Sequence, residues 1–135
     1  MPKIDAKKLL KAAAAATRKS YAPYSRFAVG AALLCSDGTL VTGCNVENSS
    51  YGLTNCAERT ALFTAVAAGK KGVCAVAVVG KGDRMPYPCG ACRQVLSEFC
   101  NPNMPVFMAR FNRLTRFETT TLGTLLPKAF DLGAT

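Results

Sequence analysis

The sequence contains no histidine among its 135 residues, which narrows the chemistry that it can support. Histidine is the side chain whose ordinary pKa lies closest to neutrality, so it serves most often as a general acid or base. Every proton transfer in this protein must therefore be assigned to carboxylates, thiols or water. Acidic residues are also few, with 8 Asp and Glu against 17 Lys and Arg.

The sequence also lacks an apolar stretch of about 18 residues, the length typical of a membrane-spanning helix. Its first residues are charged and then alanine-rich, without a signal-peptide pattern. The net charge of +9 raises the question of a nucleic-acid partner, but the basic residues are scattered and not interleaved with aromatic side chains. We therefore expect a soluble cytoplasmic protein that binds neither membrane nor nucleic acid.

Length and cysteine content favour one intracellular domain. A chain of 135 residues, half of them hydrophobic, can bury one core but is too short for two ordinary domains, so residues 1–135 are assigned to one domain. Four of the seven cysteines, Cys35, Cys44, Cys74 and Cys100, lie mostly in apolar runs. Buried thiols in a reducing cytosol are the simplest interpretation.

The order of apolar and turn-forming segments predicts an α/β fold. Helices are expected at 5–19, at about 56–69, where Thr54 or Asn55 would be the cap, at 89–99, and at 122–130, where Pro127 interrupts. Strands are expected at 27–35, 40–46, 73–80 and 104–109, with an edge strand at 115–119. This order predicts a three-layer α/β/α sandwich with a mixed, roughly five-stranded sheet.

Three cysteines and one glutamate form the clearest chemical pattern in the chain. Cys56-Ala57-Glu58 is followed by a Pro-Cys-x-x-Cys motif that contains Cys89 and Cys92. A catalytic zinc keeps three protein ligands and leaves the fourth position to water, whereas a structural zinc has four. The spacing matches a zinc-deaminase signature in which the glutamate is the general acid and base. We predict one Zn²⁺ per chain, held by Cys56, Cys89 and Cys92.

The expected positions of these side chains suit that role. Helix N-termini lower the pKa of a thiol, and residues three apart lie on the same side of one helical turn, as Cys89 and Cys92 do. Three thiolates make the site negative, so Arg59 is predicted to donate to them and offset that charge. The alternatives are a surface salt bridge for Arg59 and an exposed helix position for Glu58.

Four segments, at 22–32, 43–48, 55–61 and 88–95, together closely resemble the small homotetrameric cytidine deaminases. The resemblance runs from about Lys7 to Phe130 and includes motifs outside the metal site. It implies hydrolytic deamination of cytidine and 2′-deoxycytidine to uridine and 2′-deoxyuridine, with release of ammonia, in pyrimidine salvage. It also implies that Glu58 protonates N3 of the base and later the leaving amine.

The resemblance assigns further residues to the nucleoside. Phe27 matches an aromatic that packs against the pyrimidine and the sugar, and Asn45 with Glu47 matches a pair that binds the ribose 3′-hydroxyl. The backbone amide of Ala57 matches a contact to the base carbonyl. Phe130 matches an aromatic supplied to a neighbouring subunit, and Tyr51 is expected to act similarly. From the residues alone, Phe27 could equally be strand core, and Asn45 and Glu47 turn residues.

Three other functions stay open at this point. One is a deaminase of another aminopyrimidine nucleoside, such as the blasticidin S deaminases, against which Phe27 and Glu47 speak. Another is editing of a base within RNA or DNA, where a 3′-phosphodiester would clash with Asn45 and Glu47. The third is a non-catalytic, zinc-stabilised nucleic-acid-binding module, which would need a fourth metal ligand in place of an open position.

Overall fold

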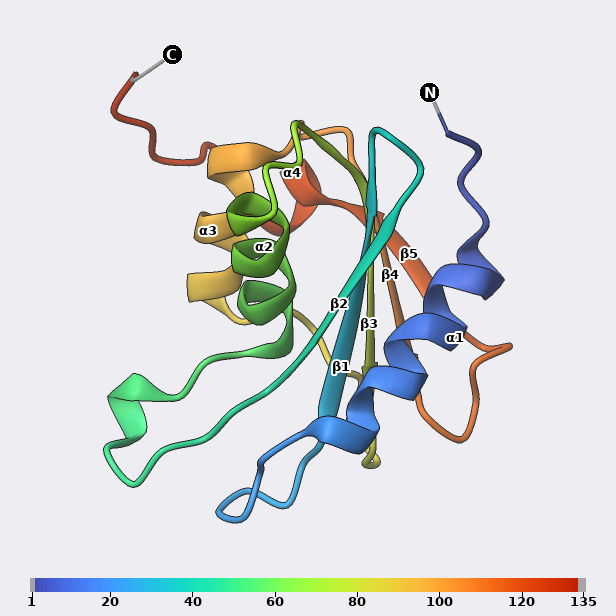
Figure 1. Ribbon diagram of the computed structural model, residues 1–135, viewed down its shortest axis with the longest axis vertical. Coiled ribbons are helices and arrows are strands. Elements are labelled where there is room, and N and C mark those ends of the chain that lie inside the picture. Colours follow the sequence, from blue (N-terminus) through green and yellow to red (C-terminus); the bar gives the residue numbers. More distant parts are fainter. Residues whose placement is uncertain (1, 134–135) are drawn as a thin grey trace.

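A five-stranded mixed sheet runs through the centre of the protein and carries helices on both faces (Figure 1). This computed structural model describes residues 2–133. The strand order is β2-β1-β3-β4-β5, with β3 and β4 parallel and the other neighbouring pairs antiparallel. The strands are β1 (Val29–Cys35), β2 (Leu40–Cys44), β3 (Val73–Gly80), β4 (Pro105–Arg110) and β5 (Glu118–Thr121).

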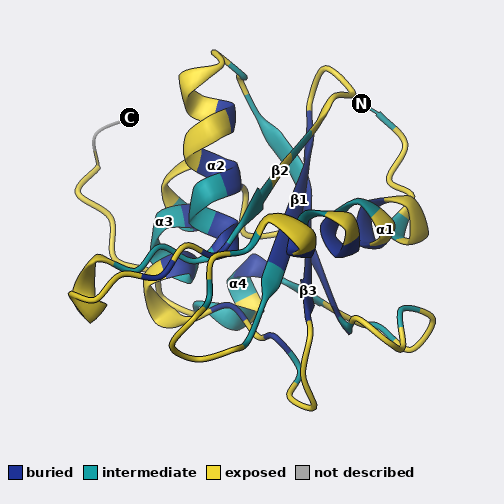
Figure 2. Cartoon of the chain, turned by 60° about the horizontal axis from the view of Figure 1, so that its bottom comes forward, coloured by how far each residue is buried: buried dark blue, intermediate teal, exposed yellow. Residues whose placement is uncertain are grey.

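Each face of the sheet has its own helical layer and its own apolar core. Helix α1 (Ala6–Ala16) covers one face, while α2 (Ala57–Ala67) and α3 (Gly90–Phe99) cover the other, joined there by the short α4 (Leu122–Leu125). Figure 2 shows the buried residues of the helices on the sides that face the sheet. Two 3₁₀ turns, Thr17–Lys19 and Tyr51–Leu53, complete the elements.

Two glycines allow the helices to lie directly against the sheet. A Cβ atom at Gly30 in β1 would meet the backbone oxygen of Ala13 in α1. A Cβ atom at Gly43 in β2 would lie 2.8 Å from the backbone oxygen of Ala57 and 2.9 Å from the Cα of Ala61, both in α2. Any larger residue at either position must therefore push a helix away.

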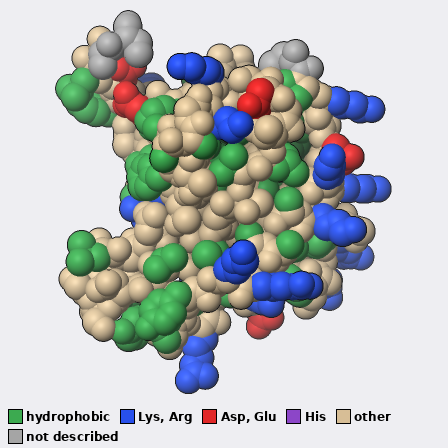
Figure 3. Space-filling model, viewed as in Figure 1, with side chains coloured by type: hydrophobic (Ala, Val, Ile, Leu, Met, Phe, Trp, Pro, Cys, Tyr) green, Lys and Arg blue, Asp and Glu red, His purple; other side chains and the backbone are tan. Residues whose placement is uncertain are grey.

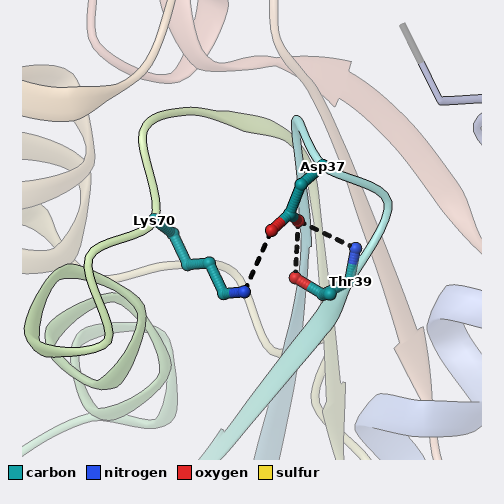
Figure 4. A network of polar contacts seen from close by, with 3 residues as sticks. All are labelled: Asp37, Thr39 and Lys70. Atoms are coloured by element: carbon teal, nitrogen blue, oxygen red, sulfur yellow. Dashed lines mark hydrogen bonds and ion pairs between the residues drawn. The ribbon is translucent and has the colours of Figure 1, made fainter.

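The β1–β2 turn is tied to the loop that follows α2 (Figure 4). One carboxylate oxygen of Asp37 accepts hydrogen bonds from the backbone nitrogen of Thr39 at 3.0 Å and from its hydroxyl at 2.7 Å. The other oxygen pairs with Lys70 Nζ at 2.9 Å. The bonds from Thr39 and Lys70 lower the pKa of Asp37, so the pairing fixes a tight hairpin turn next to the end of α2.

The predicted fold class is confirmed, and the differences concern the ends of elements. The first helix ends at Ala16, because the chain tightens into a 3₁₀ turn, and Asp5 is its cap rather than its first residue. The prediction that Thr54 or Asn55 caps the next helix is wrong, since Cys56 holds that position. The edge strand begins only at Glu118. The last helix stops at Leu125, two residues before Pro127, which cannot continue a helix.

None of the helices within residues 2–133 has the length and apolar character that crossing a membrane requires.

Candidate active site

Two helix N-termini bring three cysteine sulfurs together on one face of the sheet. Cys56 is the N-cap of α2 and Cys89 is the N-cap of α3, while Cys92 lies in the first turn of α3. The three sulfurs lie within 4.8 Å of one another, and those of Cys56 and Cys89 are 3.6 Å apart. The sequence prediction that these cysteines form one cluster thus agrees with their placement.

The cysteine cluster favours thiolate at Cys56. A hydrogen bond from the Cys92 thiol, together with donation from Arg59 and Cys89, lowers the pKa of Cys56 to about 5. The same bond to Cys56, reinforced by burial, raises the pKa of Cys92. The cluster therefore holds negative charge at neutral pH, as a cation-binding site of sulfur ligands must.

Arg59 lies behind the sulfurs, one helical turn after Cys56. Its Nη2 donates to Cys56 Sγ at 3.3 Å, and this bond raises the pKa of the guanidinium further. Its Nε is buried and has no hydrogen-bond partner within the described part of the chain. Arg59 therefore has a second, unpaired N–H besides the one that it donates to Cys56. The surface salt bridge, the alternative for Arg59, is not what the geometry shows.

Glu58 projects from the first turn of α2 into the same site. The side chain is only 4% exposed, and this burial raises the pKa of its carboxyl to about 7, with the charge on Cys56 adding to the effect. Glu58 is therefore not an exposed helix glutamate. A buried carboxyl with a raised pKa beside a metal-binding cluster is typical of an acid–base catalyst.

These groups open into a cavity of about 330 Å³. Its lining includes Cys56, Glu58 and Cys89, together with the predicted residues Phe27, Asn45, Glu47 and Tyr51. The cavity has the size of a small-molecule site. Its lining also contains residues that the sequence patterns did not single out, namely Ser25, Val29, Thr54, Val78, Arg84, Pro86 and Tyr87. Three of the seven, Arg84, Pro86 and Tyr87, come from the segment after β3, whose only sequence signal is its position just before Pro88.

Asn45 and Glu47 are held in place by the backbone that leads into β1. Asn45 Nδ2 donates to the Phe27 carbonyl at 2.8 Å, and the Val29 nitrogen donates to Asn45 Oδ1 at 2.9 Å. Glu47 accepts from the backbone nitrogens of Tyr24 and Ser25 at 2.9 and 3.1 Å. Its bond from the Ser25 hydroxyl lowers the pKa of the carboxyl, which is therefore charged. Both side chains are rigidly oriented where they line the cavity.

The remaining predicted residues lie in different surroundings. Ala57 is fully buried as the first residue of α2. Tyr51 is 68% exposed and lines the cavity of its own chain. Phe130 is 69% exposed and lines a separate cavity between α3 and the C-terminal segment, so within one chain it is not brought to the site.

The donor set fits zinc. Cysteine thiolates are zinc ligands, and three of them leave one position of a tetrahedral ion open. The guanidinium of Arg59 balances part of their charge. Glu58 lies close enough to interact electrostatically with Cys56 and Cys92, without being needed as a ligand.

The family model for the cytidine and deoxycytidylate deaminase zinc-binding region matches residues 3–108. The chain belongs to this family. The matched range contains every predicted site residue except Phe130, and zinc is the metal of the family.

Individual members are similar over nearly the whole chain. The cytidine deaminase of Sporosarcina psychrophila is 51% identical over 128 residues, which cover 95% of this chain and 93% of the relative. That of Mycobacterium tuberculosis is 44% identical and covers 98% and 94%. The crystal structure of cytidine deaminase from Burkholderia pseudomallei superimposes with a TM-score of 0.88 at 50% identity, covering 94% of this chain and 100% of that one.

Proposed function

We propose that this protein is a zinc-dependent hydrolase that converts cytidine and 2′-deoxycytidine to uridine and 2′-deoxyuridine with release of ammonia, within pyrimidine salvage. The observation that carries the proposal is the meeting of a buried carboxyl, Glu58, with the Cys56, Cys89 and Cys92 cluster beside one cavity of about 330 Å³, whose lining includes Glu58, Cys56 and Cys89. High identity to cytidine deaminases along the chain supports it.

In this proposal Cys56, Cys89 and Cys92 hold the metal, and Arg59 donates to their sulfurs. Bound zinc supplies a Lewis acid that lowers the pKa of a water molecule and so provides the attacking oxygen. Glu58 accepts a proton from the attacking water at its carboxylate and passes it to N3 of the pyrimidine. It then takes a second proton, from the oxygen now bonded to C4, and passes that one to the leaving amine. Because Glu58 is buried, its proton exchanges with the substrate rather than with bulk water.

The nucleoside lies along the cavity wall. Phe27 packs against the pyrimidine and sugar, and Asn45 with Glu47 binds the ribose 3′-hydroxyl. The rigid hydrogen bonds of Asn45 and Glu47 support this assignment, since a preorganised pair loses little entropy on binding. The backbone amide of Ala57 faces the base carbonyl, and Tyr51 borders the open end.

We further propose a homotetramer in which neighbouring subunits complete each site. Phe130, exposed and away from the cavity of its own chain, is the residue offered to a neighbour. Large apolar side chains are exposed on α2, α3 and the adjoining segments, among them Leu53, Phe63, Val66 and Phe99. In Figure 3 the apolar side chains gather on that side, away from most of the Lys and Arg. An apolar face of this kind is typical of a subunit interface.

The proposal also includes the cellular location of the protein and its organisation as one domain. A site of three thiolates needs reduced sulfur, which favours a reducing cytoplasm. One catalytic domain spanning residues 1–135 is part of the same proposal, although Met1 and residues 134 and 135 lie outside the described residues.

The decisive experiment is the ultraviolet absorbance change on adding cytidine to purified protein, with zinc content assayed in parallel. Deamination to uridine changes the pyrimidine chromophore directly. We expect rapid conversion with about one zinc per chain. Full zinc without conversion would overturn the proposal in favour of another aminopyrimidine substrate. Salt-sensitive nucleic-acid binding without ammonia release would point to a binding module instead.

A further inference from the structure

The ring of Phe27 is enclosed by the segment between β3 and α3. Gly80, the last residue of β3, lies so close that a Cβ atom there would be 2.7 Å from Cζ of the ring. A Cβ atom at Gly82 would be 2.8 Å from both Cδ1 and Cε1. Real Cβ atoms do not approach other atoms so closely, so the ring occupies space that only glycine leaves free.

These glycines serve packing rather than backbone conformation. The glycines with positive φ within residues 2–133 are Gly38, Gly69 and Gly133, so neither Gly80 nor Gly82 needs the left-handed region. An alanine at Gly82 would therefore fit the backbone and clash mainly with Phe27. The position of the ring can be changed from this segment without straining the main chain.

Arg84 covers the same ring. Its guanidinium carbon lies 5.3 Å from the centroid of Phe27, a cation–π distance, and both side chains line the cavity. Among the described residues that line this cavity, Arg84 is the single cation, and Glu47 and Glu58 are the acidic residues.

The segment that carries Arg84 is tied to the sheet on both sides of it. Arg110 Nη1 donates to the carbonyl of Asp83 at 3.1 Å. The hydroxyl of Tyr87 donates to the carboxylate oxygens of Glu118 in β5 at 2.9 and 3.1 Å. The backbone nitrogen of Lys81 donates to the carbonyl of Ala28 at 2.8 Å, next to Phe27 itself. Arg84 is thus presented to the ring from a fixed backbone.

We propose that residues 80–87 form a positioning clamp for Phe27, in which Gly80 and Gly82 make room for the ring and Arg84 holds its face. The proposal rests on the proposed function, because Phe27 is there the wall against which the nucleoside packs. Arg84 and Gly82 are positioning residues that act through Phe27. Glu58 and the three cysteines belong to α2, α3 and their caps, so none of them lies within residues 80–87. The clamp therefore controls substrate affinity, and disturbing it raises KM while leaving kcat near the wild-type value.

The first test is Gly82→Ala, with Gly72→Ala as the matched control. A Cβ atom at Gly72 would make only ordinary contacts, the nearest at 3.4 Å from Ser36 Oγ. We expect KM for cytidine to rise roughly tenfold in Gly82→Ala because the ring is displaced, and to stay unchanged in the control. A crystal structure of Gly82→Ala is expected to show the Phe27 ring moved. An unmoved ring would overturn the proposal whether or not the enzyme is active.

The second test is Arg84→Ala, with Arg116→Ala, an exposed arginine outside the cavity lining, as control. Loss of an exposed cation–π contact is expected to raise KM about two- to fivefold. Arg84→Lys, which keeps the charge but not the planar stacking, is expected to recover part of the loss. An unchanged or lower KM in Arg84→Ala, or a fall in kcat alone, would contradict the positioning role.

A double-mutant cycle separates the clamp from a general structural effect. In a Phe27→Leu background, Arg84→Ala is expected to cause no further rise in KM, because the ring on which it acts is gone. Additive effects would overturn the proposal. Turnover of cytidine by the wild type tests the proposed function separately. Inhibition constants for uridine, measured in the same variants, repeat the double-mutant cycle for binding alone.

Discussion

The two faces of the sheet are built from similar helices that begin in different ways. On one face, α1 starts at Asp5, whose carboxylate accepts a hydrogen bond from the Lys8 nitrogen at 3.2 Å. On the other, α2 and α3 start at Cys56 and Cys89, neither of which makes a side-chain cap hydrogen bond. Cap positions are normally among the best places to stabilise a helix. The second face gives up that stabilisation to direct sulfur at a metal.

On both faces a glycine lets a helix lie against the sheet, but the helices place different side chains there. Gly30 admits α1 and Gly43 admits α2 at backbone contact distance. Helix α1 carries basic side chains outward, where Figure 3 shows most of the blue side chains. Helix α2 carries Glu58 and Arg59 inward. One face thus mainly supports the fold, and the other supports the reaction.

The largest expected effect comes from Glu58→Gln, which removes the acid–base group of the second face but should leave its structure intact. In Glu58→Gln the general acid and base is lost, so kcat should fall about 10²- to 10⁴-fold. Zinc content should stay at about one per chain and the unfolding transition should change little. Near-normal turnover would contradict the role of Glu58, as would loss of the metal in this variant.

Substituting Gly30 and Gly43 tests directly how the two faces of the sheet differ. Gly30→Ala and Gly43→Ala should each lower the free energy of unfolding by about 1–3 kcal/mol, because each forces a helix off the sheet. Only Gly43→Ala moves α2, so only it should lower kcat/KM, by up to about 100-fold. Urea unfolding combined with activity per folded molecule checks both values. Equal losses of activity would show that the two faces are coupled.

Arg59→Gln tests the charge behind the sulfurs. Without the guanidinium, the thiolates lose a hydrogen-bond donor, and zinc affinity or activity should fall about 10- to 100-fold. The same substitution at Arg18, exposed on the α1 side, is the control and should leave both unchanged. Metal competition with a chromogenic chelator measures the affinity. A matching loss at Arg18 would indicate a non-specific effect of net charge.

The smallest effects concern the helix caps. Asp5→Ala should cost about 1 kcal/mol of stability, with kcat unchanged, because only a cap hydrogen bond is lost. Cys89→Ser should lose zinc, yet in chelator-treated protein it should be more stable than the chelated wild type by about 0.5–1 kcal/mol, because serine is a better cap. Urea unfolding with and without chelator measures both. If metal-free Cys89→Ser were less stable than the chelated wild type, this would contradict the view that cysteine at the cap costs helix stability in exchange for metal binding.

Much of the fold followed from local patterns. The apolar, β-branched runs at 27–35 and 40–46 predicted two strands, and the structure pairs β1 with β2 across the turn between them. Gly69, the end of the helix expected at about 56–69, has a φ of 78° just beyond α2. The ends were harder. Local cap preferences favour Thr54 and Asn55 over Cys56, so only the tertiary structure could place Cys56 at the cap.

Part of the candidate site was also predictable from local sequence patterns. Cys89 and Cys92 meet because residues three apart share one side of a helical turn, which any helix at this position would ensure. The clamp around Phe27 had no comparable signal. Gly80, Gly82 and Arg84 resemble ordinary loop residues until β3 places them beside the segment that leads into β1.

The residue types and spacings of the chain alone predicted the metal, its ligands and the acid–base group, because ligand chemistry and helical periodicity are properties of a few neighbouring residues. Burial and proximity between distant segments were decided only by the tertiary structure. The raised pKa of Glu58 and the stacking of Arg84 on Phe27 exist because β1, β3, α2 and α3 converge at one end of the sheet. That convergence depends on contacts between residues far apart in sequence, which no short pattern encodes.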